Sequence, residues 1–296
     1  MLEFSKLELH NIDKLKPLIL QSDSEICNNT VGGIFMWRDF FSMEYALYND
    51  TVIFKAKAKY NEIYTVFSLP LGKDLQGGIE KTAEYCHAHG LPVAFYAVTD
   101  EDLEPLRSTH KNYELYTNEN WSDYIYNASD LVTLEGRKYS GKRNHVNQFK
   151  RAYSDHIFEE INEENLSKVR SFYEELCSGL TFTTKTAIED HDKTIEVLEN
   201  YDTYSLPGGL LRIGDTVVAF SIGEINGNVL FIHVEKADMR YKGVYQVINN
   251  EFARHFVSEG IEFINREEDD GDLGLRTSKQ SYHPCRTTPK YIFVVL

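Results

Sequence analysis

Residues 231–252 read FIHVEKADMRYKGVYQVINNEF, and this stretch decides the fold. Its apolar start predicts a strand, a charged loop follows, and apolar residues then recur at helical spacing. Gly243 stands where the helix begins. A glycine at a helix start after a strand leaves backbone N–H groups pointing outward, which suits a phosphate group. A glycine that only begins a helix, with no ligand role, would give the same sequence pattern. The stretch therefore predicts a strand–loop–helix unit whose loop is a candidate ligand site.

The same order of elements runs through both halves of the chain. In the first half we expect short helices, strands at 45–50, 51–58 and 62–70 with turns at Asn49–Asp50 and Asn61–Glu62, a helix at 74–90 and strands at 91–98 and 123–134. In the second half we expect helices within 158–179 and 187–201, three strands within 208–238, a helix at 241–260 and a strand at 262–265. The repetition predicts an α+β fold of two related domains.

Composition narrows the class of protein. The 296 residues exceed what one core usually organises, and 42% hydrophobic with 26% charged residues is a globular composition. The formal net charge of −15 repels nucleic acid at long range, so RNA or a phosphate compound would need a local basic patch. The four cysteines lack metal-ligand spacing. No apolar run is long enough to span a bilayer and no signal peptide is evident, so we expect a cytoplasmic protein.

One segment reverses the acidic trend. Residues 136–153 read GRKYSGKRNHVNQFKRAY, which holds six basic residues and no acid. The spacing predicts a helix with Val146 and Phe149 on its apolar face. Two interpretations stay open: a connecting helix that forms ion pairs with acidic surfaces, or an anion site for a substrate's phosphates.

A second charged segment follows the strand at 262–265. Residues 265–284 read NREEDDGDLGLRTSKQSYHP, and we expect a helix at 272–280 capped by Asp269 or Asp270. Arg276 and Lys279 are three residues apart and share a helix face. Carboxylates at a strand end beside cations suit amine deprotonation and oxyanion stabilisation. The alternative is a capped, solvated turn.

The loop before Gly243 resembles the pyrophosphate loop of the GNAT acetyltransferases, which has the form [RQ]-x-x-G-x-[GA]. Arg240 and Gly243 match its first and fourth positions. Tyr245 stands where that family has a small residue, so we expect coenzyme A to bind weakly or not at all.

Three segments together resemble one bacterial family: 123–134 (DYIYNASDLVTL), 134–153 (LEGRKYSGKRNHVNQFKRAY) and 264–291 (INREEDDGDLGLRTSKQSYHPCRTTPKY). They are similar to proteins grouped with the C-terminal domain of phosphatidylglycerol lysyltransferases, whose fold is similar to that of the Fem peptidoglycan aminoacyltransferases. The resemblance implies two tandem GNAT-like domains packed together: residues 1–135, a basic connecting helix at 136–156, and residues 157–296 with the active site.

The resemblance also implies a function. It is the transfer of an aminoacyl group from aminoacyl-tRNA to an amine or hydroxyl of a small-molecule, peptide or lipid acceptor. The tRNA would bind through a local basic patch, and no metal or cofactor would be required. Glu267 or Asp269 would act as base, and Arg276 and Lys279 would hold a phosphate or stabilise the oxyanion. The expected substrate-binding residues are Lys142, Arg143, Asn144, Arg240, Gly243, Tyr245, Gln246, Asn265 and Tyr282. The alternatives are an acyl-CoA-dependent N-acyltransferase and a non-catalytic ligand-binding protein.

Overall fold

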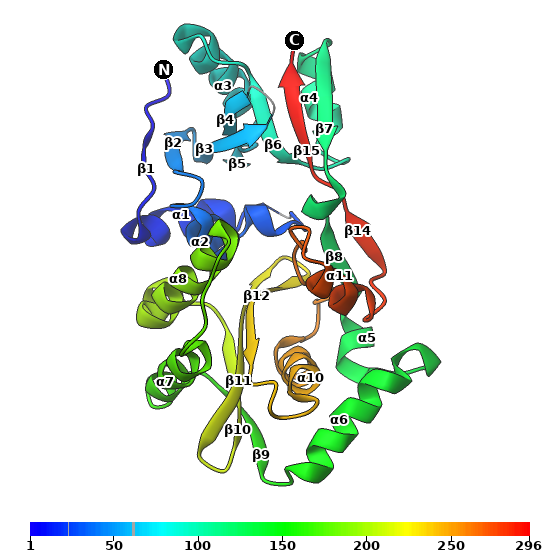
Figure 1. The fold of residues 1–296 in the computed structure, drawn as a ribbon. Helices are drawn as coiled ribbons and strands as arrows, with labels where there is room; N and C mark the ends of the chain where they lie inside the picture. The colour runs from blue at the N-terminus through cyan, green and yellow to red at the C-terminus, as the bar shows by residue number, and fades with distance from the viewer. Residues whose placement is uncertain (23, 61–62) are drawn as a thin grey trace. The chain divides into compact units, whose positions relative to one another are not determined.

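The computed structural model describes residues 1–22, 24–60 and 63–296, and it divides into two compact units (Figure 1). The first unit comprises residues 1–123, 268–271 and 287–296, and the second comprises residues 124–267 and 272–286. Each unit is a mixed arrangement of helices and one sheet, as the α+β expectation requires.

The first sheet has eight strands among the described residues, in the order β1-β2-β3-β4-β6-β15-β7, with β5 paired to β3. Its strands are β1 Ser5–Lys6, β2 Glu44–Tyr48, β3 Thr51–Tyr60, β4 Ile63–Phe67, β5 Leu71–Gly72, β6 Ala94–Val98, β7 Tyr113–Thr117 and β15 Tyr291–Val295. The accompanying α-helices are α1 Ile12–Ile19, α2 Val31–Trp37, α3 Leu75–His89 and α4 Leu103–Thr109.

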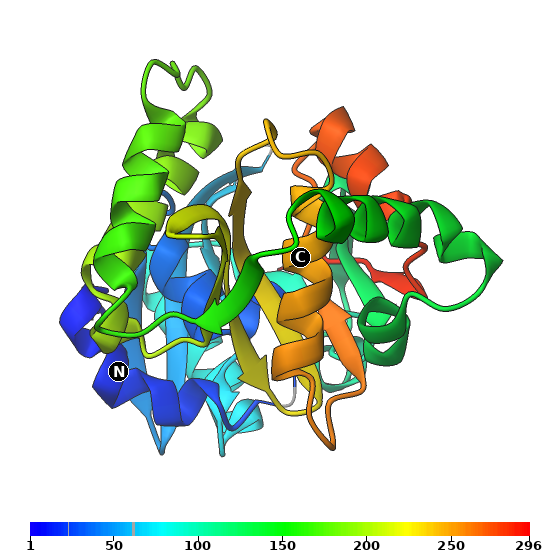
Figure 2. The same ribbon diagram turned by 90° about the horizontal axis from the view of Figure 1, so that it is seen from below.

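The second sheet has seven strands in the described part of the chain, in the order β14-β8-β13-β12-β11-β10-β9. Its strands are β8 Asp123–Asn127, β9 His156–Glu160, β10 Gly208–Ile213, β11 Thr216–Asn226, β12 Val229–Ala237, β13 Phe263–Asn265 and β14 Arg286–Thr288. The helices of this part are α5 Ala128–Thr133, α6 Ser140–Ala152, α7 Leu166–Cys177, α8 Lys185–Glu199, α9 Tyr201–Tyr204, α10 Val244–Phe256 and α11 Leu273–Gln280. Figure 2 shows α10 lying along the yellow strands of this sheet, with which it packs.

The two units repeat one connection. Most neighbouring strands run antiparallel, but β4 and β6 are parallel in the first sheet, and β12 and β13 are parallel in the second. In each case the long helix of the connection, α3 or α10, lies between the two parallel strands in the chain. The expectation of an α+β fold with two related units is confirmed.

Each sheet also takes a strand from the far half of the chain. The C-terminal strand β15 pairs with β6 and β7 in the first sheet, whereas β8 pairs with β13 in the second. The boundaries of the units therefore differ from those expected at residues 135 and 157. The second unit already begins at Tyr124, and residues 287–296 belong to the first unit. Hydrophobic alternation identifies a strand but does not say which sheet accepts it.

Local details also differ from expectation. The expected strand at 123–134 is the strand β8 followed by the helix α5. The expected turn at Asn49–Asp50 is confirmed, since both residues have positive φ (45° and 54°) between β2 and β3. The turn expected at Asn61–Glu62 lies outside the described residues. Within those residues, no helix combines the length and the apolar character needed to cross a membrane.

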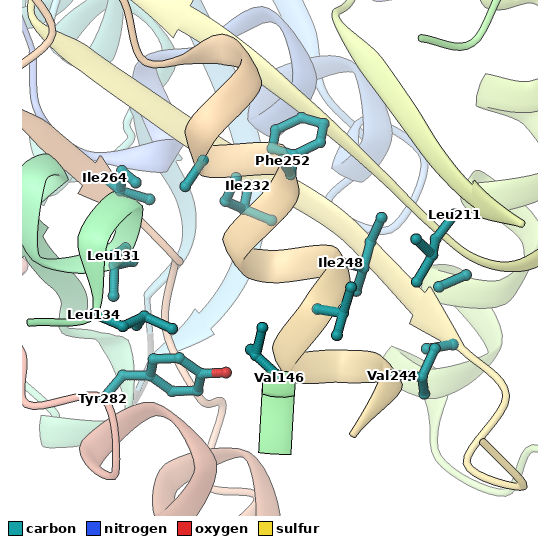
Figure 3. Close-up of a cluster of buried hydrophobic side chains, with 14 of the residues drawn as sticks. Leu131, Leu134, Val146, Leu211, Ile232, Val244, Ile248, Phe252, Ile264 and Tyr282 are labelled. Atoms are coloured by element: carbon teal, nitrogen blue, oxygen red, sulfur yellow. The ribbon is translucent and has the colours of Figure 1, made fainter. Parts of the chain in front are cut away.

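The core of the second unit positions the basic helix. Val146 and Phe149 of α6 are buried, as its spacing predicts, and they join α10 and the sheet in one apolar cluster (Figure 3). Tyr282, which follows α11, belongs to the same cluster. Helix α6 therefore presents its polar face from a fixed position.

Candidate active site

The second unit has an opening in its strand pairing. β12 and β13 pair only from Val229↔Phe263 to Phe231↔Asn265, and β12 then continues to Ala237 without this neighbour. Charged side chains gather just beyond the paired residues. Glu235 lies on β12 and Arg266 follows β13.

A buried network joins these two residues to helix α10. Arg266 Nη2 donates to Glu235 Oε1 at 3.1 Å, and both side chains are only about a tenth exposed (10% and 11%). Asn249 Nδ2 donates to Glu235 Oε2, also at 3.1 Å. Burial disfavours the guanidinium charge, but Glu235 more than compensates and raises the pKa of Arg266. Arg266 Nη1 and Asn249 Oδ1 are buried and have no hydrogen-bond partner in the described chain, so the network offers one donor and one acceptor.

Lys142 lies beside this network. Its Nζ donates to Ser281 Oγ at 2.6 Å and lies 3.9 Å from the centre of the Tyr282 ring. Arg266 contacts the same ring, with Cζ 4.9 Å from the centre. Burial, together with the nearby Arg266 guanidinium, lowers the pKa of Lys142 to about 8. The expected substrate-binding residues Lys142 and Tyr282 are thus brought together, with Arg266 as a third member.

The backbone after β13 is held in an unusual conformation. Glu267 has a φ of 58°, a left-handed value uncommon for a residue with a side chain. Its N–H donates to Asn265 Oδ1 at 2.6 Å, and its carbonyl oxygen accepts from Lys279 Nζ at 3.2 Å. Lys279 is buried on α11. Three expected site residues are therefore connected through Glu267.

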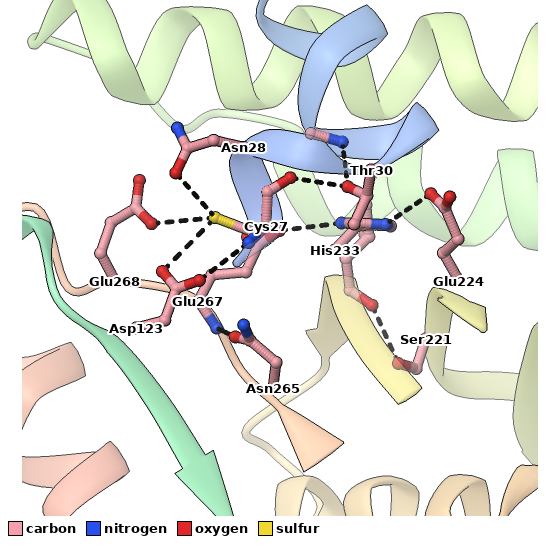
Figure 4. A network of polar contacts seen from close by, with 12 residues as sticks. Cys27, Asn28, Thr30, Asp123, Ser221, Glu224, His233, Asn265, Glu267 and Glu268 are labelled. Atoms are coloured by element: carbon pink, nitrogen blue, oxygen red, sulfur yellow. Dashed lines mark hydrogen bonds and ion pairs between the residues drawn. The ribbon is translucent and has the colours of Figure 1, made fainter. Parts of the chain in front are cut away.

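The Glu267 carboxylate is also engaged. His233 is almost fully buried and donates from Nδ1 to Glu267 Oε1 at 2.8 Å and from Nε2 to Glu224 Oε2 at 3.2 Å (Figure 4). Burial opposes the imidazolium, but hydrogen bonds to the two carboxylates raise the pKa of His233 to about 9. The contact with His233 holds the Glu267 side chain in place, and the expected base role of Glu267 stays a prediction.

The other expected catalytic residues are placed as follows. Asp269 belongs to the first unit, is only 1% exposed, and accepts the Gly271 N–H at 2.9 Å. At least one carboxylate of the segment is therefore buried. A turn that is only solvated would leave its carboxylates exposed. The cap of α11 is Asp272, which accepts the Leu275 N–H, and not Asp269 or Asp270 as expected. Arg276 is half-buried on the same helix as Lys279.

The glycine loop has a structural explanation of its own. Gly243 has a φ of 89°, and a Cβ there would lie 2.8 Å from the carbonyl oxygen of His145 on α6. Tyr245 packs against the apolar cluster, and burial raises the pKa of its hydroxyl. Arg240 is exposed and pairs with Asp238 at 2.7 Å. The loop therefore brings α10 close to α6, and a ligand role for its residues, Gln246 included, stays a prediction.

The remaining expected residues lie on α6. Arg143 donates from Nη1 to the carbonyl oxygens of Leu134 and Gly136, which fastens the segment before α6 to the helix. Asn144 is exposed. Of the basic segment, Lys142 is the residue that reaches the buried network.

The first unit contains a separate polar cluster. Cys27, Asp123 and Glu268 place Sγ and carboxylate oxygens within 4.8 Å of one another (Figure 4). Lys290 Nζ donates to Asn28 Oδ1 at 2.7 Å and pairs with Asp123 at 2.7 Å and Glu268 at 2.9 Å. Burial raises the pKa of Asp123 to about 6 although Lys290 opposes it. Such a set of atoms suits a metal ion, but the Lys290 ammonium already supplies positive charge at this place.

Several residues of these networks were not predicted from the sequence, among them Glu235, Asn249, Arg266 and His233. Glu235 and Asn249 stand among other polar residues of their strand and helix, such as Lys236 and Asn250, so the sequence did not single them out. Buried polar residues in such positions need partners or a ligand. After β13 the run of acids dominates the pattern, and Arg266 stands inside it without a signal of its own.

Solved structures share this architecture over the whole chain. A conserved protein of unknown function from Bacteroides thetaiotaomicron is 29% identical, with a TM-score of 0.87 and full coverage of both chains. L-PGS from Bacillus licheniformis is 17% identical, with a TM-score of 0.66 over 96% of this chain and 91% of that one. FemX is 10% identical, with a TM-score of 0.59 over 98% and 96%. The last two show the fold, which is that of the GNAT-like acyltransferases of the Fem type.

Sequence comparison then gives the family. Residues 21–294 match the family described as phosphatidylglycerol lysyltransferase, C-terminal, and the chain belongs to it. An uncharacterized protein of Mycoplasmoides gallisepticum is 25% identical over 187 residues, which make up 60% of this chain and 58% of that one. The match thus covers less than two thirds of that relative's length. The resemblance inferred from the sequence is confirmed.

Proposed function

We propose that this protein is an acyltransferase that moves an aminoacyl group from aminoacyl-tRNA to an amine or hydroxyl acceptor. The observation that carries the proposal is the buried Glu235–Asn249–Arg266 network where β12 and β13 separate. An aminoacyl ester presents an α-ammonium group. Each Glu235 oxygen can accept a further hydrogen bond, and Asn249 Oδ1 has no partner among the described residues, so this environment suits an ammonium group.

Lys279 is the candidate group for the reacting carbonyl. Attack on an aminoacyl ester places negative charge on the carbonyl oxygen, and a buried ammonium stabilises that charge. Glu267 holds Lys279 through its carbonyl oxygen, and His233 and Asn265 hold Glu267. Asp269 is retained as the candidate base and Arg276 as a candidate phosphate contact.

The partners follow from this chemistry. A donor tRNA must approach a chain of net charge −15 through its local basic residues, which the α6 segment carries. The acceptor is a small molecule, a peptide or a lipid that carries the nucleophilic amine or hydroxyl. Aminoacyl-tRNA is a cytoplasmic substrate, so the proposal includes a cytoplasmic site of action.

The proposal is tested with tRNA charged separately with each labelled amino acid, in the presence of a panel of amine and hydroxyl acceptors. We expect label transfer by the wild-type protein from at least one donor. Lys279→Met should lower kcat by about 100-fold or more, in the range of a lost oxyanion contact. Asn249→Leu should mainly raise KM for the donor. The exposed Lys168→Met variant is the control and should behave as wild type.

Two outcomes would contradict the proposal. Turnover with acyl-CoA and not with any aminoacyl-tRNA would favour the N-acyltransferase alternative. Specific ligand binding without turnover of either donor class would favour a binding protein on the same fold.

A further inference from the structure

Lys142 and Arg266 are two cations against one aromatic ring. The Tyr282 ring centre lies 3.9 Å from Lys142 Nζ and 4.9 Å from Arg266 Cζ. A tyrosine ring attracts each cation, but the two cations repel each other in a partly desolvated place. Such an arrangement is costly unless negative charge is supplied.

Among the residues that the structure describes, Glu235 is the one carboxylate paired with these cations. Glu235 pairs with Arg266 Nη2 and also accepts from Asn249, so its single charge is already shared with the Arg266 guanidinium. Lys142 contacts the Ser281 hydroxyl and the Tyr282 ring, and the described residues include no carboxylate paired with it. The group is left with one excess positive charge in a protein whose overall charge is strongly negative.

Hydrogen-bond donors are available to an anion. The Arg266 side chain is about nine-tenths buried, and its Nη1 has no hydrogen-bond partner among the described residues. Lys142 Nζ has three donors, and one meets Ser281 Oγ. The two residues come from different elements, α6 and the segment after β13.

We propose that Lys142, Arg266 and Tyr282 form a subsite that binds a phosphate group of the ligand. Tetrahedral oxygens can accept from donors on two separate elements, and the group's charge balances the excess cation. The inference deepens the proposed function by naming the group bound here, and it rests on that function only for the identity of the ligand. Phosphate binding is measurable without any transfer.

The experiment measures binding of adenosine 5′-monophosphate, glycerol 3-phosphate and acetate by calorimetric titration at fixed ionic strength. The proteins are the wild type, Lys142→Met, Lys142→Arg and the exposed control Lys168→Met. We expect saturable binding of at least one phosphate compound and about 10- to 100-fold weaker binding by Lys142→Met, the range of a charged hydrogen bond. Lys142→Arg and Lys168→Met should retain the wild-type affinity within about threefold.

The two phosphate compounds distinguish the sources. Binding of the nucleotide alone assigns the phosphate to the donor's terminal nucleotide, and binding of glycerol 3-phosphate alone assigns it to an acceptor head group. Binding of both shows that the phosphate itself is recognised. Each of these results supports the subsite.

Other results overturn it. They are no saturable binding of either phosphate compound, equal affinity in Lys142→Met and wild type, an equal loss in Lys168→Met, or acetate binding as tight as phosphate binding. Unfolding temperatures check that Lys142→Met is folded, and we expect no decrease because the substitution removes repulsion from Arg266. Retained phosphate binding without aminoacyl transfer would refute the proposed function and leave the subsite in place.

Discussion

The buried pair of Glu235 and Arg266 gives the sharpest test of the candidate site. Arg266→Met leaves the Glu235 carboxylate buried with Asn249 as its remaining partner, and Glu235→Gln leaves the guanidinium buried without a counterion. Removing one partner of a buried pair costs about 3–5 kcal/mol. In the double variant neither charge remains, and the introduced glutamine amide still accepts from Asn249, so the loss should be well below the sum of the single losses. We expect a coupling energy of at least about 2 kcal/mol.

The assay is urea unfolding followed by circular dichroism. Trp37 and Trp121 both lie in the first unit, so tryptophan fluorescence does not report directly on the site. The double-mutant cycle needs the wild type, both single variants and the double variant at one pH. Additive losses, or single losses below about 1 kcal/mol, would show that the pair is solvated and that our description of a buried network is wrong.

Three further predictions concern groups outside this pair. The pKa of His233 is about 9 in the folded protein and 6.5 in an unfolded chain, so protonation of His233 stabilises the folded state by about 3 kcal/mol. This contribution is fully present below pH 6.5 and is lost as pH rises through 9. The urea midpoint of the wild type should fall over this interval, and that of His233→Gln should fall less; parallel curves would refute the assignment. Lys290→Met should destabilise the first unit by about 3–5 kcal/mol, because it leaves the buried Asp123 carboxylate without its cation. Tryptophan fluorescence during urea unfolding measures this loss. An unchanged midpoint would contradict it. Gly243→Ala should lower the free energy of unfolding by about 1–3 kcal/mol, because position 243 has a positive φ and a Cβ there would clash with the His145 carbonyl. Urea unfolding measures this loss, with Asn144→Ala as an exposed control. Equal midpoints for the two variants would contradict the prediction.

The periodicity of apolar residues along the sequence predicts most of the helices and strands. Apolar spacing predicts α10 and α6 together with their buried residues, and glycine and asparagine pairs predict turns, because these signals are local. Partner choice is not local. The pattern of β15 is that of any buried strand, and no residue in it specifies the first sheet.

The site was predicted where charge clusters in sequence and missed where charges meet only in space. Lys142, Tyr282 and Lys279 come from charged or motif-bearing segments, and the structure places them around the end of β13. Glu235 and Asn249 lie on separate elements, so their contact depends on tertiary packing. Asp272 caps α11 in place of its neighbours because the cap is fixed by one hydrogen bond, which sequence spacing locates only to within a turn.

The exchange of β8 and β15 has a consequence for synthesis of the protein on the ribosome. Domains usually fold in order as the chain emerges, with the N-terminal one first. Here the first sheet stays open between β6 and β7 until residues 291–295 have been made, and Lys290 reaches Asp123 and Glu268 at the same late stage. Until then the edges of β6 and β7 that pair with β15 are open, and the Asp123 and Glu268 carboxylates lack the Lys290 ammonium. The second sheet is complete with β14 at Thr288, so its sequence is available before that of β15, and the first sheet cannot be completed before the second unit has been synthesised.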